Sequence, residues 1–289
     1  MSQPAPSIAL ALSASFLGFP THFGFLREMV RNGHSPAAIA GSSAGAIVAG
    51  LYAAGVKTET MEELFTRKDL RKHFHERFTL LRTIRTFLGR PSCPAIFRGH
   101  KLHDLLKEYV GDIQIEDCKT ARLHLAVTNL HTSRVALRTT GPLVDTILAS
   151  CALPGIIAPR QINDALLWDG GLGSSVPIEP WIDDPSITHI VAHSIIHEAQ
   201  LAARATTHRI NFYGAMAASH QLLADELLHW KLQLAKRAGK QTTAIETVTP
   251  RPRLGLPFTL PPPKPWPDYS RDLMNIGGES AKKAAAQLA

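Results

Sequence analysis

IAGSSAGAIVAGLYAAG, residues 39–55, is the stretch of this 289-residue sequence that decides the fold. It opens at the end of a short apolar run, and the uncharged residues 44–54 stop at Gly55, a typical residue at a helix C-terminus. We therefore expect a buried strand, a tight turn and a buried helix. The uncharged run from Ala38 to Val56 is also long enough to span a membrane, but its many Gly, Ala and Ser residues favour the buried arrangement.

The turn itself, Gly41-Ser42-Ser43-Ala44-Gly45, fits the pattern G-x-S-x-G. In that pattern a nucleophilic serine stands on a sharp turn between a strand and a helix. Gly41 and Gly45 lack the side chains that would clash beside Ser43. The helix that follows directs free N–H groups and a partial positive charge toward a developing oxyanion. Ser43 is therefore the candidate nucleophile, and the alternative is a turn of small residues packed on a sheet.

Strands alternate with helices along the first two hundred residues, which is typical of an α/β fold with a parallel or mixed sheet and helices on both faces. Strands are expected over 8–13, 37–40, 123–128, 135–138, 166–168 and 187–196, and helices over 23–32, 44–54, 58–64, 100–110, 141–151 and 208–238. The proline-rich residues 250–267 predict an extended connector. Gly277 and Gly278 are expected to lead into a polar surface helix.

Composition excludes several classes of protein. Apolar residues make up 45% of the chain and charged residues 19%, which excludes a disordered or fibrous protein. Cys93, Cys118 and Cys151 are odd in number and far apart, so neither a disulfide framework nor a metal site is expected. The first residues lack the basic region of a secretory signal. These features predict a cytoplasmic protein.

A candidate proton acceptor for Ser43 lies at Asp169, where the apolar run ALLW ends and Gly170 and Gly171 follow. Ligands of open α/β sheets bind outside the carboxyl ends of strands, and glycines there allow close approach of the backbone. The alternative for this segment is an ordinary Asp-Gly turn. A Ser-His-Asp triad also stays open, with His193 and His197, on or just after a late strand, as the histidines to consider.

Three blocks in order give the chain a resemblance to the patatin-like phospholipases over at least residues 8–185. They are the stretch 39–55, TNLHTSRVALRTTGPLVDTILASCALPGIIAP (128–159) and DGGLGSSVPIEP (169–180). The resemblance implies a three-layer α/β/α fold with a central, mostly parallel sheet. It also implies a Ser43–Asp169 dyad without histidine that hydrolyses lipid or other acyl esters and needs no cofactor or metal. We expect a catalytic domain over 1–249, with the connector and C-terminal helix of 250–289 packed on it.

One segment departs from the family pattern. The family's first strand runs into S-G-G-G-x-[RK]-G, whose backbone N–H groups form the oxyanion hole, whereas residues 13–19 here read SASFLGF. Because the donors are backbone groups, a hole is expected through the N–H groups of Ala14, Ser15 and Ala44, or one reshaped around Gly18. Two alternatives stay open: a catalytically weak lipid-binding member of the fold, and an acyltransferase that uses an acceptor other than water.

The basic charge is concentrated in residues 67–90, RKDLRKHFHERFTLLRTIRTFLGR, which hold eight Lys or Arg against two acidic residues. The whole chain carries a net charge of +7. Apolar residues recur in the segment at helical spacing, so it is expected to form a basic amphipathic helix. Such a helix suits peripheral contact with an anionic membrane, here the inner membrane surface, or it covers an acyl pocket. The alternative is an ordinary solvated face. No nucleic-acid partner is expected, since no matching fold signature is present.

Overall fold

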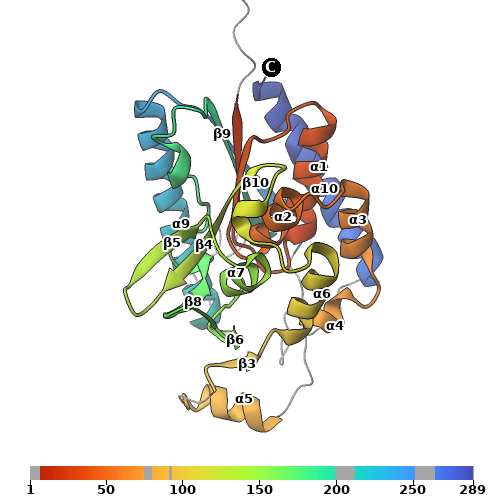
Figure 1. Cartoon of the computed structure of the whole chain (residues 1–289), viewed down its shortest axis with the longest axis vertical. Coiled ribbons are helices and arrows are strands. Elements are labelled where there is room, and N and C mark those ends of the chain that lie inside the picture. The colour runs from red at the N-terminus through yellow and green to blue at the C-terminus, as the bar shows by residue number, and fades with distance from the viewer. Residues whose placement is uncertain (1–6, 75–79, 91–92, 199–211, 251–263, 289) are drawn as a thin grey trace, which may run out of the picture.

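The computed structural model describes residues 7–74, 80–90, 93–198, 212–250 and 264–288, and an eight-stranded sheet lies at its centre (Figure 1). The strands of this sheet are β1 (Ile8–Leu12), β2 (Ala38–Gly41), β4 (Arg122–Asn129), β5 (Arg134–Arg138), β7 (Arg160–Ile162), β8 (Ala165–Asp169), β9 (His189–His197) and β10 (Gln241–Thr249). Their order is β10-β9-β1-β2-β4-β8-β7, with β5 also paired to β4. All pairs from β10 to β4 are parallel, whereas β5, β7 and β8 pair antiparallel. The expected α/β fold with a mostly parallel sheet is confirmed.

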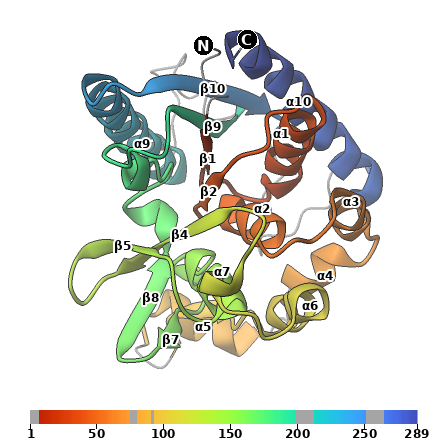
Figure 2. The same ribbon diagram turned by 45° about the horizontal axis from the view of Figure 1, so that its top comes forward.

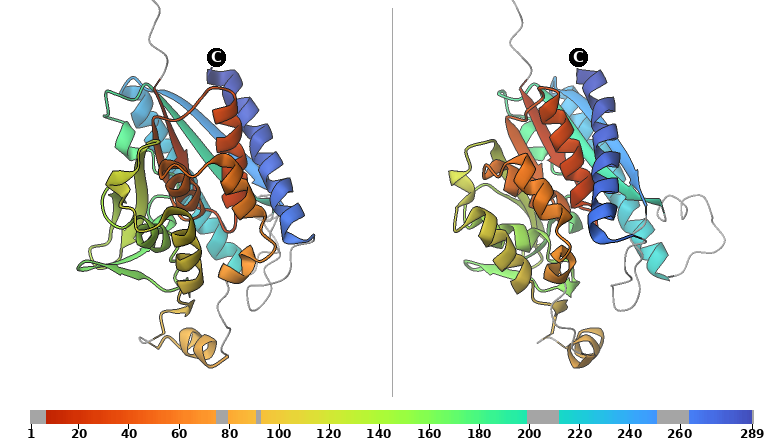
Figure 3. Two further views of the ribbon diagram at one scale, coloured as in Figure 1. Left: turned by 45° about the vertical axis from the view of Figure 1, so that its right-hand side comes forward. Right: turned by 90° about the vertical axis from the view of Figure 1, so that its right-hand side faces the viewer.

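Helices cover both faces of the sheet, which gives three layers (Figures 2 and 3). The helices are α1 (Phe19–Arg31), α2 (Ala44–Ala53), α3 (Thr58–Thr66), α4 (Leu70–Phe74), α5 (Leu80–Phe87), α6 (His100–Val110), α7 (Leu143–Ser150), α9 (Phe212–Arg237) and α10 (Trp266–Leu288). Figure 2 shows α9 on one side of the parallel strands and α1, α2 and α10 on the other. A separate two-stranded sheet pairs β3 (Ala95–Phe97) with β6 (Gly155–Ile157).

The side chains of β1 explain how the two helical layers differ. Leu10 and Leu12 belong to the large apolar cluster beneath α1, α2 and α10, whereas Ala9 and Ala11 belong to a smaller cluster with Ala235 of α9. Successive residues of a strand point to opposite faces. Large side chains therefore fill one interface, and small ones let α9 approach the other face closely.

Glycines bring α1 and α10 into backbone contact (Figure 3). A Cβ at Gly24 of α1 would overlap the carbonyl oxygen of Met274, and one at Gly277 of α10 would overlap that of Thr21. The expectation that Gly277 and Gly278 lead into a surface helix is therefore wrong. Both lie inside α10 and are buried, because the two helices touch there.

Other expectations differ from the structure in extent. Residues 241–249 form the edge strand β10, which was not expected, and α1 begins at Phe19 rather than at Phe23. The helix expected over 67–90 is shorter than expected, because residues 67–69 and 88–90 are not helical; the described part contains α4 and α5, and residues 75–79 lie outside it. Part of the expected helix over 208–238 and most of the proline-rich connector also lie outside the described ranges. The domain boundary expected at residue 250 stays a prediction.

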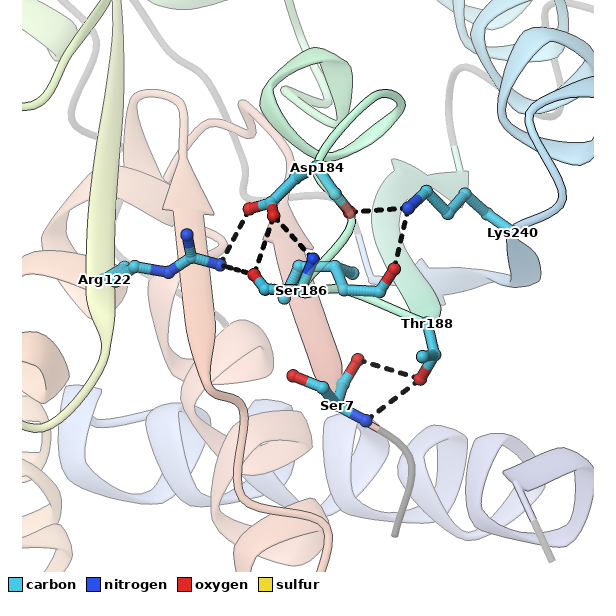
Figure 4. A network of polar contacts seen from close by, with 7 residues as sticks. Ser7, Arg122, Asp184, Ser186, Thr188 and Lys240 are labelled. Atoms are coloured by element: carbon cyan, nitrogen blue, oxygen red, sulfur yellow. Dashed lines mark hydrogen bonds and ion pairs between the residues drawn. The ribbon is translucent and has the colours of Figure 1, made fainter. Parts of the chain in front are cut away.

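A polar network ties together the strand ends farthest from Ser43 (Figure 4). The Arg122 guanidinium lies 2.8 Å from the Asp184 carboxylate, and the Lys240 ammonium donates to the backbone carbonyls of Asp184 and Ile187. Hydrogen bonds from Ser186 and Arg122 hold the pKa of Asp184 at about 2, so this carboxylate stays charged. The network thus anchors the starts of β4, β9 and β10 and leaves the opposite edge of the sheet to the candidate site.

No helix in the described ranges has the length and apolar character that crossing a membrane requires. The uncharged run from Ala38 to Val56 contains β2, the Ser43 turn and α2, and it is mostly buried in the core. The preference for a buried turn and helix in this run is confirmed.

Candidate active site

Ser43 occupies a strained turn between β2 and α2. Its backbone angles, φ 52° and ψ −116°, lie outside the regions that L-amino acids ordinarily adopt. A Cβ at Gly41 would overlap the carbonyl of Gly45, and a Cβ at Gly45 would overlap the carbonyl of Leu12. Both motif glycines are therefore required by close backbone approach. The turn has the geometry that the sequence pattern predicted for a nucleophile.

The Ser43 hydroxyl donates a hydrogen bond to Asp169, with Oγ 2.8 Å from Oδ2. The other carboxylate oxygen, Oδ1, accepts from the backbone N–H of Gly171 at 2.7 Å. Gly171 sits so close that a Cβ there would lie 2.6 Å from the Cβ of Ala14, and a Cβ at Gly170 would overlap the carbonyl of Ala126. The structure thus brings the two predicted site residues together and makes both glycines after Asp169 necessary.

The direction of β8 decides from which side Asp169 reaches Ser43. Asp169 ends a strand that runs antiparallel to β4, and it pairs there with Val127. The strand therefore enters from the carboxyl edge of the parallel strands and carries Asp169 inward toward Ser43. The general rule places ligand sites at the carboxyl ends of parallel strands, whereas Asp169 stands at the end of an antiparallel strand.

Asp169 is almost completely buried, with 4% of its surface exposed. This burial raises the pKa of Asp169 to about 7, against the opposing effect of the hydrogen bonds from Gly171 and Ser43. An ordinary aspartate is too weak a base to take a proton from a serine at neutral pH. A carboxylate whose pKa is near 7 is much better matched to that task.

Residues at the end of α7 contact the backbone of the serine turn. The backbone N–H of Ser43 donates to Ser150 Oγ, and the Cys151 thiol contacts the carbonyl of Ser43 at 3.3 Å. Burial and the nearby Asp169 raise the pKa of Cys151 well above its ordinary value, so the thiol stays neutral and acts as a donor. Asp169 N–H in turn donates to the carbonyl of Ala152. Sequence reasoning did not single out these contacts, although the block 128–159 that carries the resemblance contains all three residues.

The histidines considered for a triad lie elsewhere in the fold. His193 is buried in β9 and bonds through its ring to His22 and Thr247, and the ring of His197 bonds to Thr249. Within the described ranges, Asp169 is the side chain that accepts the Ser43 hydroxyl proton in a hydrogen bond, and no histidine does so. The geometry therefore favours a dyad over a triad.

The loop expected to form the oxyanion hole follows β1. The N–H of Ala14 donates to the carbonyl of Ser175, so this group already has an acceptor in the fold. Among the described residues, no acceptor is found for the N–H groups of Ser15 and Ala44, and Ala44 is the first residue of α2. The oxyanion hole stays a prediction, and Ser15 and Ala44 are its available donors.

The unusual composition of this loop has a steric reason. A Cβ at Gly18 would overlap Ser15 Oγ and lie 2.9 Å from Ser15 Cβ. The side chain of Ser15, where the family pattern has glycine, thus fills the space that a side chain at position 18 would need. The two departures from the pattern compensate each other.

We therefore expect Gly18→Ala to destabilise the protein by about 1–3 kcal/mol, as overpacking of a close contact does. In the double variant Ser15→Gly/Gly18→Ala most of that loss should be recovered, because the overlapping side chain is gone. Urea denaturation of the wild type, both single variants and the double variant gives the coupling energy directly. Additive effects of the two substitutions would contradict the steric explanation.

Comparisons with known proteins identify the family to which the chain is similar. The patatin-like phospholipase family model matches residues 10–182. An uncharacterized NTE family protein of Mycobacterium tuberculosis (strain ATCC 25618 / H37Rv) is 32% identical over 176 residues, which cover 61% of this chain and 46% of that protein. Lysophospholipase NTE1 of Yarrowia lipolytica is 27% identical over 172 residues, which cover 60% of this chain and 12% of the yeast protein. The chain thus spans less than half the length of these relatives.

A solved structure shares the fold. VipD from Legionella pneumophila superposes with a TM-score of 0.54 at 12% sequence identity, covering 98% of this chain and 67% of that one. The family model covers more than half of the chain and includes both Ser43 and Asp169. With its serine turn, its buried aspartate and its mostly parallel sheet, the chain belongs to the patatin-like phospholipase family.

Proposed function

We propose that this protein is a serine esterase that hydrolyses lipid acyl esters, of the phospholipase or lysophospholipase type, through Ser43 and Asp169. The observation that carries the proposal is the 2.8 Å hydrogen bond from Ser43 Oγ to a buried carboxylate whose pKa is about 7. The match to the patatin-like phospholipases and the relative named lysophospholipase NTE1 support a lipid ester as substrate.

In the proposed reaction, Asp169 takes the hydroxyl proton as Ser43 Oγ attacks the ester carbonyl carbon. The negative charge that develops on the carbonyl oxygen is received by the N–H groups of Ser15 and Ala44. Asp169 then protonates the departing alcohol, which leaves an acyl ester on Ser43. A water molecule that gives its proton to Asp169 attacks this ester, releases the fatty acid and restores the serine hydroxyl. No cofactor or metal is required in these steps.

The same proposal includes the place of action. A cytoplasmic protein that meets its substrate at a lipid–water interface accounts for the charge pattern of residues 67–90, and we infer peripheral contact with an anionic membrane there. No step or contact in this proposal involves nucleic acid.

One observation favours a second candidate, a catalytically weak lipid-binding member of the fold. Ala14 N–H is already bonded to Ser175, and the loss of a single oxyanion donor typically lowers the rate by about 100- to 1,000-fold. Binding of lipid without turnover would be the mark of that candidate.

We expect a fluorophosphonate probe to label the wild-type protein once, on Ser43, because an activated serine attacks the phosphorus and displaces fluoride. Ser43→Ala should stay unlabelled. Ser42→Ala is the matched control, since it removes the neighbouring hydroxyl, which is buried and makes no hydrogen bond to Asp169 within the described residues. Intact-protein mass spectrometry and peptide mapping give the stoichiometry and the position of the label.

Turnover of p-nitrophenyl esters from butyrate to palmitate is measured on the same three proteins. Wild type and Ser42→Ala should release nitrophenol, and Ser43→Ala should not exceed the buffer rate. Labelling of Ser43 without turnover of any ester would identify the catalytically weak member, and absence of both would exclude the proposed nucleophile.

A further inference from the structure

The short helix α5 exposes its apolar side. Leu81, Ile84, Phe87 and Leu88 are between 46% and 68% exposed, and they recur at spacings that place them on one side of the helix. In a helix packed on a globular core, the apolar side ordinarily faces inward and the polar side faces water. Here the arrangement is reversed. Figure 1 shows α5 at one end of the molecule, away from the helical layers that cover the sheet.

The polar side of α5 faces the protein and holds the helix in this orientation. Arg82 Nε donates to the backbone carbonyls of Ala95 and Ile96 at 3.0 and 2.8 Å. The Thr86 hydroxyl is buried on the same side. Because Arg82 holds the polar side of the helix against β3, the apolar residues are left pointing outward.

This helix is connected to the active site through the small sheet. Ala95, whose carbonyl accepts from Arg82, pairs in β3 with Gly155 of β6. Only a few residues separate β6 from Cys151 and Ala152, which contact Ser43 and Asp169. In Figure 1, α5 lies at one end of the molecule, next to β3. The small sheet therefore links the helix that carries the exposed apolar side to the residues that contact Ser43 and Asp169.

Exposed basic side chains lie in α5 and in the segments on either side of it along the chain. Arg85 of α5 and Arg90 just beyond it are exposed, and so are Lys68 and Lys72 in the preceding segment. Positive charge next to exposed apolar side chains fits a surface that offers both hydrocarbon and negative charge. A bilayer that contains anionic lipids is such a surface.

We propose that the outward side of α5, formed by Leu81, Ile84, Phe87 and Leu88, is a membrane-docking surface for anionic bilayers. Its four apolar side chains insert at the boundary between head groups and acyl chains, while Arg85 and Arg90 contact lipid phosphates. That docking brings Ser43 to its lipid substrate rests on the proposed esterase activity; the docking itself does not.

Docking is tested by flotation with vesicles of phosphatidylcholine and phosphatidylglycerol, using full-length protein that carries Ser43→Ala so that no lipid is consumed. We expect the triple variant Leu81→Ser/Phe87→Ser/Leu88→Ser to lower the partition coefficient by about ten-fold or more, because it removes most of the inserting apolar surface. Arg85→Gln/Arg90→Gln should lower it on anionic vesicles and leave the weaker binding to pure phosphatidylcholine unchanged.

Helix α9 offers a matched control. Leu222, Leu223 and Leu227 are as exposed as the α5 residues, but no Lys or Arg lies between residues 218 and 230. Leu222→Ser/Leu223→Ser/Leu227→Ser should therefore bind vesicles like the parent. Equal loss from both triple variants would overturn the proposal, as would unchanged binding of the α5 variant. So would light scattering that shows a dimer which only the α5 substitutions dissociate, because a second copy would then cover this side.

Hydrolysis separates this proposal from the proposed function. With Ser43 intact, the α5 triple variant should hydrolyse soluble p-nitrophenyl butyrate at the wild-type rate and vesicle lipid about ten-fold more slowly or worse. Wild-type protein that floats with vesicles but hydrolyses neither substrate would contradict the esterase and leave the docking surface standing. Rapid hydrolysis by a protein whose vesicle binding does not depend on α5 would contradict the docking surface and leave the esterase standing.

Discussion

Replacing Asp169 with Asn is expected to reduce ester hydrolysis by about 10,000-fold, the size of effect seen when a catalytic acid of a serine hydrolase is lost. Asn keeps the shape of the side chain and can still accept the Gly171 N–H, but it cannot take the proton that the Ser43 hydroxyl must release. Comparison of kcat/KM for wild type and variant on one chromogenic ester measures the loss.

The same substitution is expected to stabilise the fold at alkaline pH. Because the pKa of Asp169 is raised from 3.8 to about 7, folding favours the protonated form; that contribution is complete below pH 3.8 and is lost as the pH rises through 7. At pH 8 the buried charge therefore costs on the order of 4 kcal/mol, which Asn avoids. Thermal unfolding at pH 8 should show a higher Tm for Asp169→Asn than for wild type.

A second signature is the pH profile of the wild type. The value of kcat/KM should fall below about pH 7, where Asp169 becomes protonated and can no longer act as a base. A variant that is inactive but also less stable at pH 8, or a profile that stays flat down to pH 5, would show that Asp169 acts as a structural group rather than as the base.

Acidification from pH 7 to pH 4 is expected to destabilise the protein strongly because of a buried pair of histidines. His22 Nδ1 lies 2.9 Å from His193 Nδ1, His22 Nε2 lies 2.9 Å from the Ser13 carbonyl, and His193 Nε2 lies 2.8 Å from Thr247 Oγ1. Since a carbonyl only accepts, His22 carries its proton on Nε2 and accepts from His193, which in turn accepts from Thr247. A further proton on either ring would break this chain.

Burial lowers the pKa of His22 to about 3 and that of His193 well below its ordinary value. Both rings therefore stay neutral in the folded protein, while an unfolded histidine takes up a proton near pH 6.5. Their contribution to stability is complete above pH 6.5 and is lost as the pH falls toward 3. Each histidine removes about 1.4 kcal/mol of unfolding free energy per pH unit in that window.

Urea denaturation at pH 7.5, 6 and 5 measures this loss. Nitrogen chemical shifts of the imidazole rings provide the control, since the rings of His22 and His193 should remain neutral at pH 5. Constant stability between pH 7.5 and 5, or early titration of His22, would contradict the assignment. Ser13 begins the candidate oxyanion loop, so the pair also supports the chain where Ser15 lies.

The serine and the aspartate were predictable from sequence because their surroundings allow almost no substitution. Backbone atoms lie where a side chain would be at Gly41, Gly45 and Gly170, and the Ala14 side chain lies there at Gly171. These positions therefore need glycine, and the sequence shows this need as short glycine patterns. The alternation of strands and helices likewise follows from which segments are buried on both sides. Local sequence patterns are enough to predict a feature when the backbone geometry of that same segment determines which residues fit.

Other features depend on contacts between distant segments, and no local pattern records them. Ser150 supports Ser43 across more than a hundred residues, and the His22–His193 pair joins α1 to β9. The edge strand β10 alternates buried and exposed residues, but its threonines give a weak apolar signal. The outward orientation of α5 follows from Arg82 bonding to β3, which periodicity alone cannot reveal.

The backbone contact between α1 and α10 has a consequence for the making of the protein. Gly24 lies against the carbonyl of Met274 although 250 residues separate them in the chain, and α10 covers the apolar side of α1. During synthesis, α1 therefore leaves the ribosome long before the helix that covers it exists. Until residues 266–288 have been translated, that side of the nascent domain stays uncovered, and a chaperone that binds apolar helices has its longest opportunity there.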